Sequence, residues 1–146
     1  MNSVIVSGGF DDLRSREVRF LQEAASRGPV EVLLWSDDVI RAQTGTSPKF
    51  PLEERQYFVG ALRFVQQVTR MDQLEGPNHL PQSAHHLAGT WVVPSEADHP
   101  AKRAFCQGMG SPIAPWQRKT CRGFRTPLQP GTTPLTAEKS AGHRLL

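Results

Sequence analysis

Residues 3–35 have the sequence "SVIVSGGFDDLRSREVRFLQEAASRGPVEVLLW", and this stretch decides the fold. Residues 3–7 are rich in β-branched side chains and precede two glycines, which predicts a buried strand that ends in a tight turn. Residues 12–27 carry apolar side chains at helical spacing, and a Gly-Pro pair ends that helix. Residues 30–35 predict a second buried strand. A strand, a helix and a strand in this order form a βαβ unit, so the sequence predicts a parallel sheet with a right-handed crossover.

The rest of the predicted domain alternates between loops and regular elements. Residues 42–51 are polar and turn-rich, which predicts a loop. Residues 51–68 predict one long helix that begins with a proline and two glutamates, as helix N-termini favour. Residues 72–86 predict a second loop, residues 89–94 a third strand, and residues 100–107 a short helix closed by a glycine.

The C-terminal part of the chain differs from the rest in charge and pattern. Residues 1–110 carry 11 Lys and Arg against 13 Asp and Glu, whereas residues 111–146 carry six basic residues against one acidic residue. Five of the 12 prolines fall in this second segment, which shows neither helical nor strand periodicity. The sequence therefore predicts one α/β domain over residues 1–110 and a basic, irregular, poorly ordered tail over residues 111–146. A weak apolar segment at residues 113–116 leaves open a slightly later end of the domain.

The composition excludes several classes of protein. No apolar run approaches the roughly 20 residues that a membrane span needs, and no basic segment precedes the apolar N-terminus, so neither a membrane protein nor a secreted one is expected. The two cysteines, Cys106 and Cys121, form no disulfide framework, which favours a cytoplasmic location. Cys106 is expected to be a buried small hydrophobe. The basic tail carries no interleaved aromatic residues, so nucleic-acid binding is not expected.

Four histidines lie close together in the sequence, namely His79, His85, His86 and His99. They fall among Pro, Asn, Gln and Ser in a predicted loop, without cysteine ligands at short fixed spacing. The sequence therefore predicts no metal site there.

The turn after the first strand has the form of an anion-binding site. Where a strand leads through glycines into a helix, free backbone N–H groups and the helix dipole both point at the turn. Gly8 and Gly9 lack a Cβ that would block a phosphate. The alternative is that the glycines serve only the tight geometry of the turn.

Three segments together resemble one known family. "GGFDDLRSREVRFLQEAASRG" (8–28) resembles the opening of the cytidylyltransferase-like nucleotidyltransferases, whose signature is G-T-F-D-x-x-H-x-G-H followed by a helix of the V-R-F-L type. "VEVLLWSDD" (30–38) is similar to the family's second strand with its Ser-Asp end. "GTSPKFPLEERQYFVGALRFVQQV" (45–68) is similar to its K-x-P-x-x-x-x-E-E-R segment and the helix that follows. The resemblance covers residues 3–70 well and residues 89–110 loosely.

The resemblance implies a fold and an activity. The implied fold is α/β, a Rossmann-like parallel sheet with helices on both faces. The implied reaction transfers CMP or AMP from a nucleoside triphosphate to a phosphorylated sugar or polyol, with release of pyrophosphate and with Mg²⁺ bridging the phosphates. A homodimer is also compatible with it. The alternative is a catalytically inactive relative that binds a nucleotide, a sugar phosphate or a protein partner.

The signature is degenerate in this chain. Aligned on residues 8–11, the family's two histidines fall on Arg14 and Glu17, and its glycine falls on Arg16. Arg14 could replace a histidine in part, since a guanidinium binds phosphate oxygens. Glu17 repels a triphosphate unless a metal bridges the two. The alternative is a solvated helix face on which Glu17 pairs with Arg14. The nucleotide-binding residues that the resemblance implies are Gly8, Gly9, Phe10, Asp11, Arg14 and Glu17.

Further candidate residues follow the first turn and the second strand. The resemblance implies a catalytic role for Lys49 beside Arg14, and binding of the acceptor by Ser36, Asp37 and Arg55. The alternatives are an exposed charged helix turn for Arg55 and an Asx-type turn for the Ser-Asp pair.

Two further points bear on the predicted site. Asp11 either orients a metal-bound phosphate or caps the following helix. The family closes its site with an R-T-x-G-I-S-T-type segment, for which "GFRTPLQPGTTPL" (123–135) is a poor match.

Overall fold

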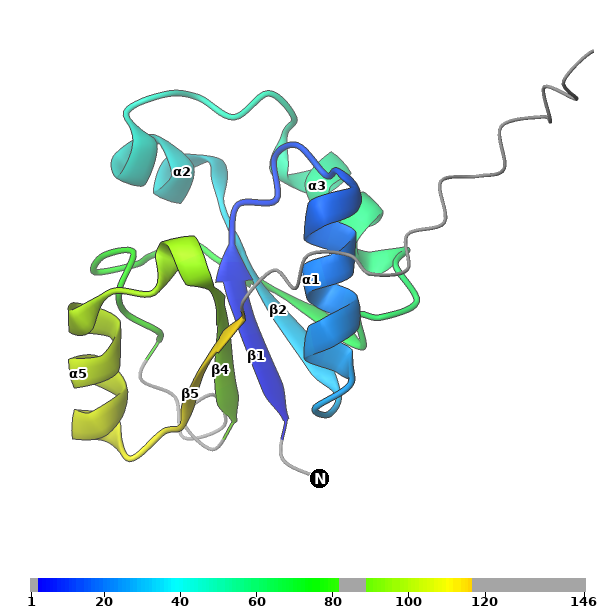
Figure 1. The fold of residues 1–146 in the computed structure, drawn as a ribbon. Coiled ribbons are helices and arrows are strands. Elements are labelled where there is room, and N and C mark those ends of the chain that lie inside the picture. Colours follow the sequence, from blue (N-terminus) through cyan, green and yellow to red (C-terminus); the bar gives the residue numbers. More distant parts are fainter. Residues whose placement is uncertain (1–2, 82–88, 117–146) are drawn as a thin grey trace, which may run out of the picture.

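The computed structural model describes residues 3–81 and 89–116. Its centre is a parallel sheet whose strands lie in the order β3-β2-β1-β4-β5 (Figure 1). The strands are β1 (Val4–Gly8), β2 (Val30–Trp35), β3 (Gln67–Met71), β4 (Thr90–Pro94) and β5 (Ile113–Trp116). The predicted parallel sheet is confirmed, and so are the predicted strands that became β1, β2 and β4.

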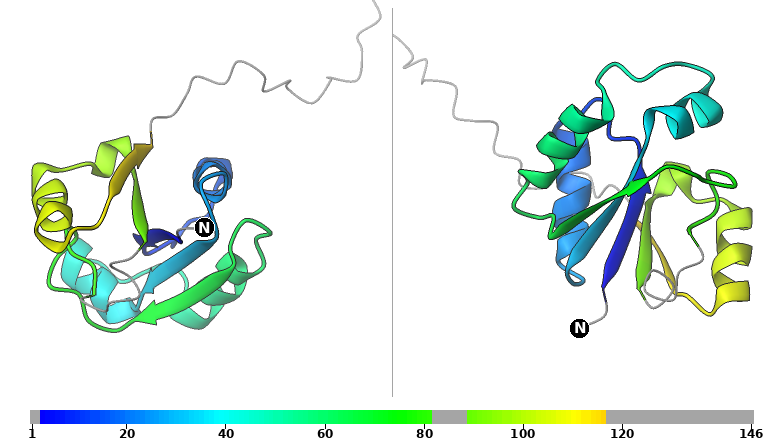
Figure 2. Two further views of the ribbon diagram at one scale, coloured as in Figure 1. Left: turned by 90° about the horizontal axis from the view of Figure 1, so that it is seen from below. Right: turned by 180° about the vertical axis from the view of Figure 1, so that it is seen from behind.

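Helices cover both faces of this sheet, as Figure 2 shows. The helices α1 (Ser15–Ala25) and α3 (Leu52–Gly60) pack on one face, and α5 (Pro100–Met109) packs on the other. The helix α2 (Asp37–Thr44) follows the carboxyl end of β2, and the short 3-10 helix η1 (Ser95–Ala97) follows β4. This Rossmann-like α/β architecture is the fold class expected from the sequence.

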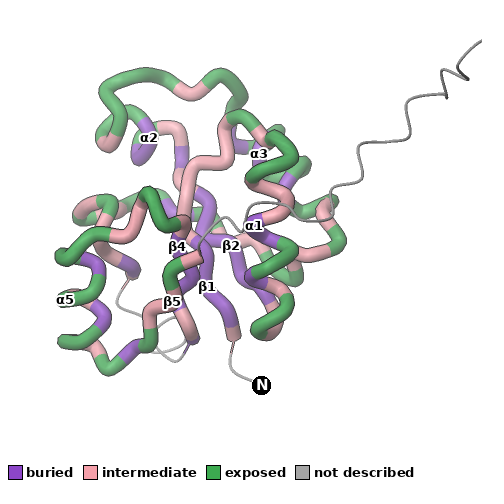
Figure 3. The backbone as a smooth tube through the Cα atoms, in the orientation of Figure 1, coloured by how far each residue is buried: buried purple, intermediate pink, exposed green. Residues whose placement is uncertain are grey.

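The alternation of side chains along the strands divides the core into two layers. Val4 and Val6 of β1 face α1 and α3, whereas Ile5 between them faces the α5 layer. Both layers are apolar because helices cover both faces, so the inner strands β1, β2 and β4 are mostly buried (Figure 3). Trp91 and Cys106 lie in the α5 layer with 2% and 1% of their surfaces exposed, which confirms Cys106 as a buried hydrophobe.

The region after α3 differs from the sequence prediction. A single helix was expected over residues 51–68, but α3 ends at Gly60 and residues 67–71 form the strand β3. The cause is tertiary: β3 pairs with β2 from Glu31↔Gln67 to Trp35↔Met71, which satisfies the hydrogen bonds of β2's outer edge. This pairing overrides the expected helix at residues 67 and 68.

The segment after β2 also differs. Residues 37–44 form α2, although no helix was expected there, and the predicted loop 42–51 begins within it. Ser36 caps the helix, since its Oγ accepts the Val39 N–H at 3.3 Å, and Gly45 ends it with φ of 75°. Both are standard end signals, but the helix between them is only eight residues long.

The sheet continues beyond Gly110. The helix α5 runs to Met109, slightly beyond the predicted end at Gln107, and Gly110 closes it with φ of 69°. Strand β5 then pairs with β4, and the Trp116 ring meets Phe20 of α1 edge-on at 5.4 Å. The later of the two expected domain ends therefore fits the sheet, while residues 117–146 lie outside the described residues.

None of the helices within residues 3–81 and 89–116 is long and apolar enough to cross a membrane.

Candidate functional site

The carboxyl end of β1 is the position where ligands gather in folds of this kind. The order of the strands reverses between β1 and β4, because the chain builds β2 and β3 on one side and then β4 and β5 on the other. In open α/β sheets the binding crevice lies outside the carboxyl ends of the strands at such a switch point. The β1–β4 ladder has only the pairs Val4↔Thr90 and Ile5↔Trp91, so these two strands do not pair with each other toward their carboxyl ends.

The glycine turn is built around close packing. A Cβ on Gly9 would lie 3.0 Å from Cδ1 of Ile40, so this glycine lets α2 approach the end of β1. A Cβ on Gly8 would lie 3.3 Å from the Phe10 ring. Phe10 has φ of 47°, in the left-handed region that few non-glycine residues adopt. The glycines thus serve the geometry of the turn, and their predicted contact with a phosphate stays a prediction.

Asp11 fastens a distant loop to this turn. Its Oδ2 accepts the backbone N–H of Lys49 at 2.7 Å, and its Oδ1 accepts that of Phe50 at 2.9 Å. The proposed capping role is wrong, because Arg14 occupies the N-cap position of α1. What Asp11 does is fix the position of Lys49, 38 residues away in the sequence.

Arg14 and Lys49 converge on a single carboxylate oxygen. Arg14 donates to Asp12 Oδ2 from Nη2 at 2.7 Å and from Nε at 3.1 Å, and Lys49 Nζ lies 3.3 Å from the same atom. The hydrogen bond from Arg14, and next that from Lys49, lowers the pKa of Asp12 below its ordinary value. The same pairing raises the pKa of Arg14. Asp12 was not singled out by sequence reasoning, although its position two residues before Arg14 was a usable signal.

Glu17 completes the N-terminus of α1. Its Oε2 accepts the backbone N–H of Arg14 at 3.0 Å, which is the reciprocal half of a capping box. The expected pairing of Glu17 with the Arg14 side chain is therefore wrong, because that guanidinium is bound to Asp12 instead. Glu17 acts on the backbone, and its predicted role in nucleotide binding stays untested.

Arg16 reaches across the switch point. Its Nη2 forms an ion pair with Glu96 of η1, which follows β4, while Arg16 itself lies in the first turn of α1. The pair therefore connects the elements that follow the two central strands. Sequence reasoning missed Glu96, because nothing in the sequence brings residues 80 positions apart together.

Arg55 is a buried structural clamp. Only 2% of its surface is exposed, and its Nη1 donates to the carbonyl oxygens of Gly9 and Trp35 at 2.8 and 2.7 Å. Its Nε donates to the Phe50 carbonyl at 2.9 Å, and Nη2 donates to Asp37 Oδ1 at 2.5 Å. The expected exposed position of Arg55 is thus wrong, and its predicted role in binding an acceptor gains no support from this geometry.

Ser36 and Asp37 lie at the carboxyl end of β2. Ser36 caps α2, so its hydroxyl oxygen already accepts one hydrogen bond. Asp37 is the first residue of α2 and pairs with Arg55, leaving about a third of its side chain exposed (32%). The structure therefore brings Asp37 and Arg55 together, but it uses the pair to hold β1, β2 and α2.

The basic side chains predicted for this site, and Arg16 beside them, each have an acidic partner. Arg14 and Lys49 share Asp12, Arg16 has Glu96, and Arg55 has Asp37. A polyphosphate entering here must displace a carboxylate or bring a cation that bridges two anions.

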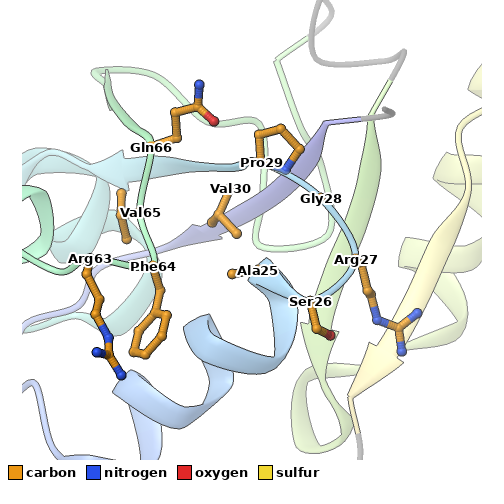
Figure 4. Close-up of a pocket in the computed structure, with 10 residues that line it drawn as sticks. All are labelled: Ala25, Ser26, Arg27, Gly28, Pro29, Val30, Arg63, Phe64, Val65 and Gln66. Atoms are coloured by element: carbon orange, nitrogen blue, oxygen red, sulfur yellow. The ribbon is translucent and has the colours of Figure 1, made fainter.

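A groove at the opposite end of the sheet is separate from this site. It has a volume of about 540 Å³ and is lined by residues 25–30 and 63–66 (Figure 4). The Arg63 guanidinium lies over the Phe64 ring, 4.8 Å from its centroid. No predicted site residue lines this groove, which adjoins the amino end of β2.

The histidines within the described residues have structural contacts. His99 caps α5, with Nδ1 accepting the Ala101 N–H at 3.1 Å, and His79 packs edge-on against Phe105 at 5.2 Å. His85 and His86 lie outside the described residues. In residues 3–81 and 89–116, no group of three or more His, Cys, Asp or Glu is placed to hold a metal ion.

Comparison with known proteins identifies the fold. No family model and no curated protein matches the chain. The structure is similar to the crystal structure of the lipopolysaccharide core biosynthesis protein from Thermoplasma volcanium GSS1, with a TM-score of 0.62 and 16% sequence identity. The match covers 80% of this chain and 95% of that chain. At this identity the similarity establishes a common fold.

Proposed function

We propose that the carboxyl edge of the sheet binds a nucleoside triphosphate and transfers its CMP or AMP group to a phosphorylated sugar or polyol, with release of pyrophosphate. The observation that carries the proposal is the convergence of Arg14 and Lys49 on one anion position beside the glycine turn. The two side chains come from different elements, so only the folded chain assembles this position. It lies at the end of the central strand, where ligands bind in this class of fold.

Two independent likenesses support the choice of reaction. The sequence segments 8–28, 30–38 and 45–68 resemble the cytidylyltransferase-like nucleotidyltransferases in order and spacing. A protein with the same fold is named for lipopolysaccharide core biosynthesis, and a sugar-containing product agrees with a phosphorylated sugar as the acceptor.

In the proposed reaction, Arg14 and Lys49 hold the phosphates in line and neutralise the charge that develops as pyrophosphate leaves. Their charges favour the transition state because it concentrates negative charge on the departing oxygens. Asp11 positions Lys49 through the backbone, and Arg55 holds the turn rigid.

Mg²⁺ fits this site as an ion carried by the nucleotide. Mg²⁺ prefers oxygen ligands, and the acidic side chains at the edge supply them. Mg²⁺ usually binds through one or two carboxylates together with substrate phosphates. Asp12 is the exposed carboxylate nearest to Arg14 and Lys49, so it is the residue proposed to hold the ion. The ion would neutralise phosphate charge beside that carboxylate.

A second candidate function is binding without transfer. It is favoured by the replacement of both family histidines, since the Arg14 side chain is bound to Asp12 and Glu17 accepts a backbone N–H. In that case the carboxyl edge of the sheet binds a nucleotide or sugar phosphate, but it lacks the two histidines that donate hydrogen bonds in the family signature.

One assay separates the two. Purified protein is given CTP or ATP with Mg²⁺ and a panel of sugar and polyol phosphates, and pyrophosphate release is followed. We expect release with at least one pair, and we expect Arg14→Ala and Lys49→Ala each to lower kcat/KM by about tenfold or more. Arg103→Ala removes an exposed arginine of α5 whose ion pair is with Asp98, away from Arg14 and Lys49, and it should leave the rate unchanged.

The opposite outcome is equally informative. If no pyrophosphate is released with any substrate of the panel, and a nucleotide raises the Tm, the protein binds nucleotide without transferring it, and the transferase is excluded. A kcat/KM of Arg14→Ala equal to that of the wild type would exclude the proposed role of Arg14.

A further inference from the structure

The carboxylate of Asp12 sits where a phosphate oxygen would bind. Three N–H donors reach its Oδ2: Arg14 Nη2 at 2.7 Å, Arg14 Nε at 3.1 Å and Lys49 Nζ at 3.3 Å. Charged donors that converge on one oxygen form the arrangement by which arginine and lysine recognise phosphate.

The backbone positions from which the two cations extend are held without Asp12. Arg14 is fixed at the N-cap of α1 by the bond from its backbone N–H to Glu17. Lys49 is fixed by the bond from its backbone N–H to Asp11. Removing the Asp12 charge therefore leaves two exposed side chains whose backbones stay in place, within reach of the same point.

The three groups are accessible to a ligand. The side chains of Arg14, Lys49 and Asp12 are 74%, 67% and 42% exposed. Asp12 is ionised at neutral pH, because the bond from Arg14, and next that from Lys49, lowers its pKa. A phosphate and this carboxylate, both negative, cannot share the same donors without repulsion.

We propose that Asp12 is an intramolecular competitor of the ligand: its carboxylate occupies the position of a phosphate oxygen and must be displaced from Arg14 and Lys49 when a phosphorylated ligand binds without a metal ion. The proposal rests on the proposed function for the class of ligand, a phosphate ester or polyphosphate. It adds the regulation of that site: metal-free phosphate binds weakly because the chain supplies its own anion.

The test is metal-free binding measured by isothermal titration calorimetry with EDTA present. The probes are pyrophosphate, for the triphosphate position, and glycerol 3-phosphate, for the acceptor position. The full-length Asp12→Asn variant keeps the size of the side chain but removes its charge. We expect its Kd for at least one probe to fall about threefold to tenfold below that of the wild type, because an exposed ion pair is a weak competitor.

Asp72→Asn is the matched control. Asp72 pairs with Arg70 two residues away, as Asp12 does with Arg14, and both partners are exposed. This variant frees one arginine and changes the net charge by the same amount, so a general charge effect would appear in both variants. We expect Asp72→Asn to bind both probes as the wild type does.

Double variants show whether Arg14 and Lys49 are the groups that bind the probe. In the Asp12→Asn background, Arg14→Ala or Lys49→Ala should abolish the gain. Asp12→Ser serves as a second variant if Asp12→Asn does not fold, as judged by circular dichroism.

Three results would overturn the proposal: equal or weaker binding by the Asp12 variants, an equal gain in Asp72→Asn, or no detectable binding by any variant. The outcome is independent of the transferase assay. If the Asp12 variants bind more tightly without metal but the protein releases no pyrophosphate, Asp12 is a competitor and the protein is not a transferase. If pyrophosphate is released but the Asp12 variants do not bind more tightly, the protein is a transferase and Asp12 is not a competitor.

Discussion

At the scale of single residues, the carboxyl edge shows how the same side chain can bind a ligand or hold the fold. Arg55 lies in a segment that resembles a substrate-binding motif, yet only 2% of its surface is exposed. It donates to three carbonyl oxygens and to Asp37. Planar guanidinium geometry lets one side chain join the ends of two strands and a loop, which a lysine could not do.

Arg55→Met is expected to destabilise the protein strongly. The substitution keeps most of the apolar stem but leaves Asp37 without its cation and removes the donor to the carbonyl groups of Gly9, Trp35 and Phe50. We expect a loss of about 3 kcal/mol in the free energy of unfolding, measured by urea denaturation.

The control for this prediction is Arg41→Met. Arg41 forms an exposed ion pair with Asp38, so its loss should cost less than about 1 kcal/mol. Similar losses in both variants would show that Arg55 is not a clamp.

At the scale of elements, the turn after β1 depends on its contact with α2. Gly9 has no space for a Cβ because Cδ1 and Cγ1 of Ile40 would lie 3.0 and 3.2 Å from it. The turn and α2 are therefore coupled, although 31 positions separate the two residues.

A double-mutant cycle tests this coupling. Gly9→Ala should lower the free energy of unfolding by about 1–2 kcal/mol through overpacking. In an Ile40→Val background, which lacks Cδ1, the same change should cost about 1 kcal/mol less. Equal costs in the two backgrounds, measured by urea denaturation, would show that the glycine is required for another reason.

The elements also show where sequence patterns are sufficient. The βαβ unit of β1, α1 and β2 could be predicted because each element carries its own period and its own end signal. The helix α2 and the strand β3 could not, because each is short and its state depends on a partner: Ile40 lies against the glycine turn, and β3 pairs with the outer edge of β2.

At the scale of the whole molecule, β5 is the last described element that joins the sheet. It pairs with β4 from Trp91↔Ile113 to Pro94↔Trp116, and Trp116 also contacts α1 through Phe20. It therefore covers the edge of β4 and connects the two halves of the fold.

Two shortened chains test this role of β5. A chain that ends at Trp116 and a chain that ends at Gly110 both lack residues 117–146, so their difference isolates β5. We expect the shorter chain to be less stable by about 3 kcal/mol, since it exposes the β4 edge and loses the burial of Ile113 and Trp116. Coincident urea transitions for the two chains would contradict this.

The sequence by itself determined the fold class, the first three elements and the glycine turn, because hydrophobic period and end signals are local properties of the chain. It also located Arg14 and Lys49 as candidate site residues. The tertiary structure alone decided what surrounds them: Asp12 between the two cations, Glu96 across the switch point from Arg16, and Arg55 in the interior. Charges act through space, so the partners of an ionised side chain are fixed only when separate elements meet.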